Sequence, residues 1–132
     1  MLNDTSHGLE CLKNLNGEIR IIRGNHDTNT KWELYNKLSD CNFYLEGWSN
    51  MIRYKKFNIY LSHFPTITSD KNKSPYLREH LLNFFGHTHS KEKMYKDNFF
   101  MYNVALDAND NCPVSIEDII EYMKEQAALA FC

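Results

Sequence analysis

Three short apolar runs in this chain each end in a polar loop that carries histidine. The runs are 19–22, 57–61 and 84–85, and the loops after them are Gly24-Asn25-His26-Asp27, Ser62-His63 and Gly86-His87-Thr88-His89. Runs rich in β-branched and aromatic residues predict strands. Because the ligands of α/β sheets collect just beyond the carboxyl ends of strands, we expect the three loops to converge on one site.

The rest of the chain predicts helices and further strands around these loops. Apolar residues recur at helical spacing in four segments, 9–15, 30–38, 77–82 and 116–123. Further strands are predicted at 43–45, 51–54, 93–95 and 99–106. Ser115 and Asp118 form a near capping box at the start of the last helix. Strands that alternate with helices indicate an α/β fold, here in a single domain of residues 1–132.

The composition is that of an ordinary globular domain. The chain has 132 residues, of which 42% are hydrophobic, 24% charged and 14% aromatic, whereas disordered chains are poor in aromatic and branched apolar residues. Its apolar runs fall far short of the ~20 residues that cross a bilayer, and no signal segment opens the chain. We therefore expect a soluble, cytoplasmic protein without a membrane partner.

The net charge and the cysteine spacing argue against a nucleic-acid-binding protein and against a zinc ribbon. The formal net charge of −2 gives no bulk attraction to nucleic acid, so any affinity for phosphate must be local. The 4 cysteines are scattered without a C-x-x-C pair, which argues against a zinc ribbon and favours a reduced compartment.

The loop residues suit a divalent transition metal. A single histidine is more often a structural or surface residue than a ligand, but Asn25, His63, His87 and His89 together form a mixed nitrogen and oxygen donor set. Neutral imidazole ligates transition metals, whereas magnesium and calcium prefer oxygen ligands alone. The set therefore predicts manganese, iron, zinc, cobalt or nickel, and the lack of thiolates argues against a closed structural zinc site.

These three loop motifs, in this order and at these separations, resemble those of the calcineurin-like metallophosphoesterases. The stretch 15–27 is especially similar to the small bacterial and phage-type members, and the resemblance covers nearly the whole chain. It implies the four-layer α/β/β/α sandwich of that family, in which helices flank two mixed sheets. Carried over by residue, it makes Asn25 and His63 ligands of one metal shared with His87, and His89 a ligand of the other.

The resemblance also implies a reaction. His26 would stabilise the reacting phosphate or protonate the leaving oxygen, and Asp27 would hold and polarise His26. A hydroxide shared by the two metals would attack phosphorus in line, with manganese as the first choice of metal. The substrate would be a small phosphoester or a nucleotide, either a monoester or a diester.

One motif of the family is missing from this chain. No Asp-x-His precedes Gly24, so the metal assigned to His89 lacks two ligands and the sandwich lacks part of its first βα unit. Asp4 is the candidate bridge between the metals, or otherwise an acidic residue near the amino terminus or a helix N-cap. His7 is a less favoured replacement ligand. The domain is thus expected to be incomplete at its N-terminus, with a sheet edge that a second copy or another partner would cover.

The sequence therefore predicts a metal-dependent phosphoesterase. The alternatives are a catalytically impaired remnant that binds one metal or assembles with a partner, and a mononuclear metal-binding module. Arg23 is expected either to reach a substrate phosphate or to be salt-bridged or solvated. Asn103 is expected to brace a turn, and His80, Trp32 and Trp48 to be structural residues.

Overall fold

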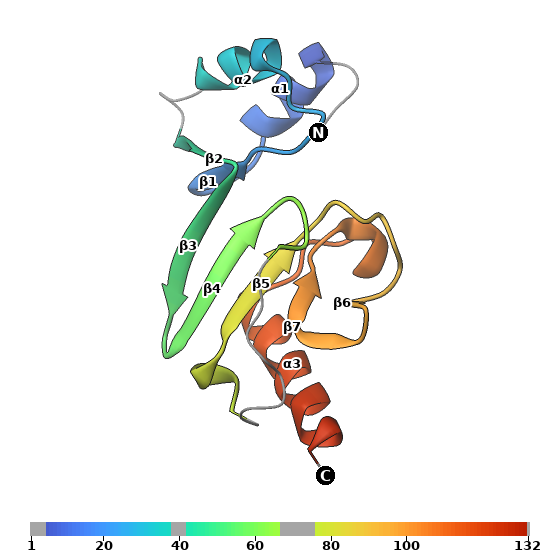
Figure 1. Ribbon diagram of the computed structural model, residues 1–132. Coiled ribbons are helices and arrows are strands. Elements are labelled where there is room, and N and C mark those ends of the chain that lie inside the picture. The colour runs from blue at the N-terminus through green and yellow to red at the C-terminus, as the bar shows by residue number, and fades with distance from the viewer. Residues whose placement is uncertain (1–4, 38–41, 67–75, 132) are drawn as a thin grey trace. The chain divides into compact units, whose positions relative to one another are not determined.

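The computed structural model describes residues 5–37, 42–66 and 76–131 (Figure 1). The chain divides into two compact units, Met1–Asn50 and Met51–Cys132. Each unit has its own cluster of buried apolar residues. The prediction of one domain over the whole chain stays a prediction.

The first unit alternates two helices with two parallel strands. Helix α1 (Thr5–Lys13) precedes strand β1 (Ile19–Ile22), and helix α2 (Asn29–Asn36) precedes strand β2 (Phe43–Gly47). β1 and β2 pair in parallel. The buried core of this unit draws one residue from each element, namely Leu12, Ile21, Tyr35 and Phe43. The apolar spacing of the sequence predicted both helices, because those residues form the face that packs on the strands.

The second unit is built on a five-stranded sheet with the order β3-β4-β5-β7-β6 (Figure 1). Its strands are β3 (Ser49–Tyr54), β4 (Phe57–Ser62), β5 (Leu81–Phe85), β6 (Met94–Tyr95) and β7 (Asn98–Asn103). β4, β5 and β7 run parallel, whereas β6 is antiparallel to β7. The carboxyl ends of the three parallel strands therefore meet at one edge of the sheet.

Helix α3 (Ile116–Ala130) packs against this sheet with an apolar stripe. Ile119, Ile120, Met123 and Ala127 are its buried residues. The Ser115 hydroxyl caps the helix by accepting a hydrogen bond from the Asp118 amide at 3.1 Å. The sequence predicted this cap and this stripe, and both predictions are confirmed.

The helix predicted at 77–82 is wrong. Only Leu77–Glu79 form a short 3-10 turn, η2, and Leu81–Phe85 form the central strand β5. Strands of a parallel sheet are covered on both faces and hence form continuous apolar runs, which cannot be told from a buried helix by periodicity alone. Phe84-Phe85 was therefore only the end of a longer strand.

The structure is a mixed α/β fold with a five-stranded sheet and, among the described residues, three α-helices. This confirms the predicted α/β class, while the four-layer α/β/β/α sandwich stays a prediction. No helix in the described part of the chain has both the length and the apolar character needed to span a membrane.

Candidate functional site

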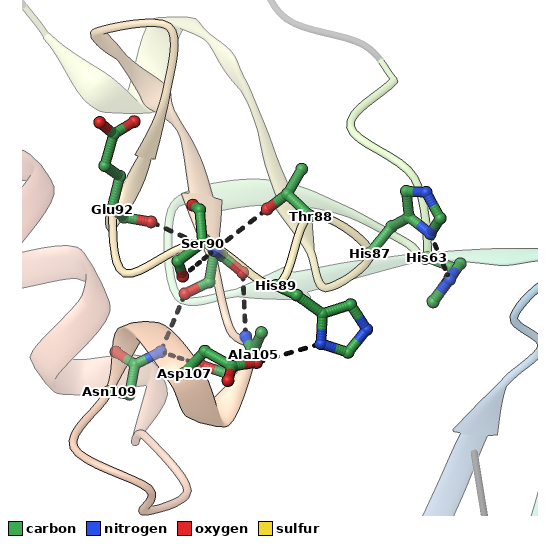
Figure 2. Close-up of polar contacts among 10 residues, drawn as sticks. His63, His87, Thr88, His89, Ser90, Glu92, Ala105, Asp107 and Asn109 are labelled. Atoms are coloured by element: carbon green, nitrogen blue, oxygen red, sulfur yellow. Dashed lines mark hydrogen bonds and ion pairs between the residues drawn. The ribbon is translucent and has the colours of Figure 1, made fainter.

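Two of the predicted ligands, His63 and His87, lie together at the carboxyl ends of β4 and β5. These strands pair in parallel with Leu61 opposite Phe84, so their following loops begin side by side. The His63 carbonyl accepts hydrogen bonds from the amides of Gly86 at 3.0 Å and His87 at 2.8 Å. Figure 2 marks a contact between the two rings. His63 Nε2 lies 3.0 Å from His87 Nδ1, and the ring planes are inclined at 70° to each other.

The 3.0 Å separation of these nitrogens permits two chemistries. One imidazole can donate a hydrogen bond to the other, depending on the tautomer. Alternatively, two nitrogens that ligate one ion at ~2.0–2.1 Å, with roughly 90–110° between the bonds, lie about 2.8–3.4 Å apart. The separation of the His63 and His87 nitrogens is therefore also that of two ligands of a single ion.

Phe64 contacts both of these imidazoles. Its ring centroid lies 4.4 Å from that of His87 and 5.0 Å from that of His63. Both histidines are half-buried. These ring contacts restrict the rotation of both imidazoles, which favours the arrangement in which their nitrogens lie close together.

The buried Asn83 holds the loop that carries His63. Asn83 lies on β5 with 0% exposure. Its amide nitrogen donates to the Tyr60 carbonyl and to the Ser62 hydroxyl, each at 3.0 Å, and its carbonyl accepts from the Thr66 amide at 2.9 Å. These bonds fix the chain on either side of His63. The sequence signal was a polar residue within an apolar strand, which our sequence analysis did not single out.

His89 does not join the pair, although it lies on the same loop as His87. Its Nδ1 is 3.1 Å from Asp107 Oδ2, and its side chain is 76% exposed (Figure 2). His89 has the left-handed φ of 47°, which is uncommon outside glycine. Among the described residues, no group of three or more His, Cys, Asp or Glu side chains could hold a metal ion.

Two buried asparagines position His89 and Asp107. Asn103, at the end of β7, donates to Thr88 Oγ1 and to the carbonyls of Ser90 and Glu92 at 3.1–3.3 Å (Figure 2). Asn109 donates to the carbonyls of Asn103 and Ala105, each at 2.9 Å, and so ties the turn that carries Asp107 to the end of β7. The expectation that Asn103 braces a turn is confirmed.

Asn25, His26 and Asp27 lie in the first unit, on the loop between β1 and α2. Asp27 is only 4% exposed, and its carboxylate accepts hydrogen bonds from the Gly24 amide at 2.8 Å and from the Tyr35 hydroxyl at 3.4 Å. Burial, and then the neighbouring Asp27 charge, raise the pKa of Tyr35, so this hydroxyl keeps its proton and remains a donor. Asp27 thereby closes the loop, while Asn25 and His26 are exposed.

Arg23 is bonded within this loop. Its Nε donates to the Asp27 carbonyl at 2.9 Å and its Nη2 to Asn29 Oδ1 at 2.6 Å.

His80, expected to be structural, is 4% exposed and stacks on Phe100 with ring centroids 3.9 Å apart. The predicted bridging residue Asp4 lies outside the described residues.

Asp107 is the acidic residue that the sequence analysis missed. It comes three residues after Val104, where the chain leaves β7, a strand that pairs in parallel with β5. Strand β7 therefore brings a carboxylate to the edge at which β4 and β5 bring imidazoles. In the sequence, Asp107 could have been found as an acidic residue that follows the end of a fourth predicted strand.

Comparison with known proteins finds a solved structure whose fold is similar to that of this chain. A crystal structure of a protein of unknown function from Aquifex aeolicus superposes with a TM-score of 0.57 and 22% sequence identity, over 92% of this chain and 70% of that one. At this identity the likeness shows the fold alone. No family model matches the sequence, and a search of curated proteins finds no match either.

Proposed function

We propose that this chain is a metal-dependent phosphoesterase, and the observation that carries the proposal is the His63–His87 pair. The two ring nitrogens are 3.0 Å apart at the carboxyl ends of two parallel strands, at the separation of two ligands of one ion. Two imidazoles leave coordination positions for other protein ligands, for water and for a phosphoryl oxygen.

A divalent ion bound there would lower the pKa of water and neutralise charge on the phosphoryl oxygens. Manganese is our first choice, with iron, zinc, nickel or cobalt as alternatives, because nitrogen donors select transition metals over magnesium and calcium. The resemblance assigns Asn25 to the same ion, Asp4 to a bridge and His89 to a second ion.

His26 is our candidate for the proton donor to the leaving oxygen. Its side chain is exposed, as a group that meets substrate must be, and it lies on a loop closed by buried hydrogen bonds to Asp27. The hydrogen bonds of Asp27 to Gly24 and Tyr35 hold the loop, and polarisation of His26 by Asp27 stays part of the proposal.

The finer fold assignment is also a proposal. We propose the four-layer α/β/β/α sandwich of the metallophosphoesterases. The alternation of helices with parallel strands in the first unit, and the parallel strands β4, β5 and β7 in the second, support this assignment.

A metal-dependent assay tests the function. Hydrolysis of bis(4-nitrophenyl) phosphate is measured with and without added manganese for the wild type and for His63→Ala, with Leu129→Ala as the control, because Leu129 is exposed and lies on helix α3. We expect manganese-dependent turnover that is lost in His63→Ala and retained in Leu129→Ala. Equal turnover without manganese, or in all three proteins, would refute the proposal.

A mononuclear metal-binding protein without hydrolytic activity is the second candidate. It is favoured by the position of His89, which contacts Asp107 rather than joining His63 and His87. Retention of one manganese ion with no turnover on monoesters or diesters would select this candidate.

A further inference from the structure

The carboxyl ends of β1 and β2 bring Trp48 beside the loop that carries His26. β1 and β2 are parallel, Ile22 pairs with Gly47, and the Arg23 amide donates to the Gly47 carbonyl at 2.7 Å. The Gly24–Asp27 loop and Trp48 therefore leave the paired strands at the same end. Gly47 takes the left-handed φ of 77°, which turns the chain just before Trp48.

Trp48 is an exposed indole with a fixed cation on one face. The sequence predicted a packing residue, but the side chain is 58% exposed because it lies beyond the end of β2. The Arg23 guanidinium carbon is 4.7 Å from the Trp48 ring centroid and 5.5 Å from that of Trp32. Arg23 is itself held by Asp27 and Asn29. The indole is thus oriented at little entropic cost to a ligand.

The neighbouring loop offers polar and positive groups. His26 and Asn25 are exposed, and Lys31 Nζ donates to the His26 carbonyl at 3.2 Å, which brings a positive charge to the loop. An oriented indole beside donors and a cation is suited to a ligand with both a planar ring and a phosphate.

We propose that Trp48 is a stacking platform for the nucleobase of a nucleotide, bound with its phosphate toward the Gly24–Asp27 loop. This inference rests on the proposed phosphoesterase function and narrows its substrate class. Stacking of a base on an aromatic side chain is sequence-tolerant, so Trp48 selects nucleotides over ring-free phosphoesters without choosing one base.

Binding of AMP and of ribose 5-phosphate, measured by calorimetry on the full chain, tests the platform. Both probes carry the same phosphate and sugar, and only AMP carries a base. We expect AMP to bind roughly tenfold to a hundredfold more tightly than ribose 5-phosphate in the wild type, the range of base stacking on an aromatic side chain. Trp48→Ala should abolish this difference, and Trp48→Phe should keep most of it.

Tyr44→Ala is the matched control, because Tyr44 is also exposed, at 47%, and lies 5.0 Å from the Arg20 guanidinium carbon. It should bind both probes as the wild type does. Equal affinities of the wild type for the two probes, or AMP binding unchanged in Trp48→Ala, would overturn the inference. A change in oligomeric mass of Trp48→Ala with AMP binding unchanged would instead assign Trp48 to a protein contact.

Hydrolysis separates this inference from the proposed function. Manganese-dependent turnover of bis(4-nitrophenyl) phosphate with no preference for AMP would overturn the platform and leave the phosphoesterase standing. A preference for AMP that depends on Trp48, without turnover of any phosphoester, would support the platform and refute the phosphoesterase.

Discussion

Two histidines on one loop of the second unit lie in contrasting surroundings. His87 is half-buried and faces the imidazole of His63, while His89, two residues later, is 76% exposed and faces the carboxylate of Asp107. An imidazole pair offers two nitrogen ligands to one ion. When its Nδ1 donates a hydrogen bond to a carboxylate, a neutral imidazole can instead offer an ion one nitrogen ligand, Nε2.

We infer from this difference that the two proposed metal positions are unequal. The proposed His63–His87 site has two imidazoles that contact Phe64, one of them on a loop bonded to Asn83, whereas the proposed His89 site has one imidazole on an exposed turn. Exposure favours exchange with solvent and weakens charge interactions. We therefore expect one tight and one weak divalent ion.

The largest effects are expected when one imidazole is removed from each proposed site. His87→Ala should lower affinity for the tight ion by more than about a hundredfold, since loss of an outer-shell partner alone costs 10–100-fold, and turnover should fall to background. His89→Ala, two residues away on the same loop, should keep the tight ion. Calorimetric titration with manganese measures both, and equal losses in the two variants would show that the sites are not distinct.

His26→Ala separates proton transfer from metal binding. Turnover should fall ~10²–10⁴-fold, the usual contribution of a general acid, while the manganese content of the purified protein stays unchanged. Steady-state rates and elemental analysis of the same preparation check this. Parallel loss of metal and turnover would make His26 a ligand.

Asp107→Asn tests whether the Asp107 carboxylate supports binding of the second ion at His89. The amide keeps the shape but removes the charge that orients His89, so the affinity of the second ion should fall roughly 10–100-fold and the tight ion should be unaffected. A manganese titration of the rate shows the change as a higher concentration needed for half-maximal turnover. An unchanged titration would mean that His89 does not bind the second ion.

Substitutions of two of the buried asparagines, Asn83 and Asn103, give the smallest expected effects. Asn83→Ala and Asn103→Ala each leave buried polar groups unpaired, which should cost about 1–3 kcal/mol of the free energy of unfolding. Denaturant titration measures this cost. Only Asn83→Ala should also weaken the tight ion, because Asn83 bonds to Ser62 and Thr66 around His63. The opposite pattern would assign the tight site to the Asn103 side.

The sequence predicted most strands and the places where their loops begin. Buried strands need apolar residues, so a short apolar run marks a strand, and the glycine or serine after it marks the start of the loop. It misassigned 77–82, where a doubly covered strand and a buried helix have the same apolar content. The motif predicted that His87 and His89 lie at one site. In the structure the backbone of His89 is left-handed, and its side chain contacts Asp107. Such a turn depends on the bonds of Asn103 to the loop, which periodicity does not reveal.

The metal content of the protein tests the central claim most directly. The wild type, the double variant His63→Ala/His87→Ala and the control Leu129→Ala are loaded with manganese, dialysed and analysed for metal. We expect about one retained ion per chain in the wild type and in Leu129→Ala, and none in the double variant. A double variant that retains its ion, or a wild type that retains none, would contradict the assignment of the tight site to His63 and His87.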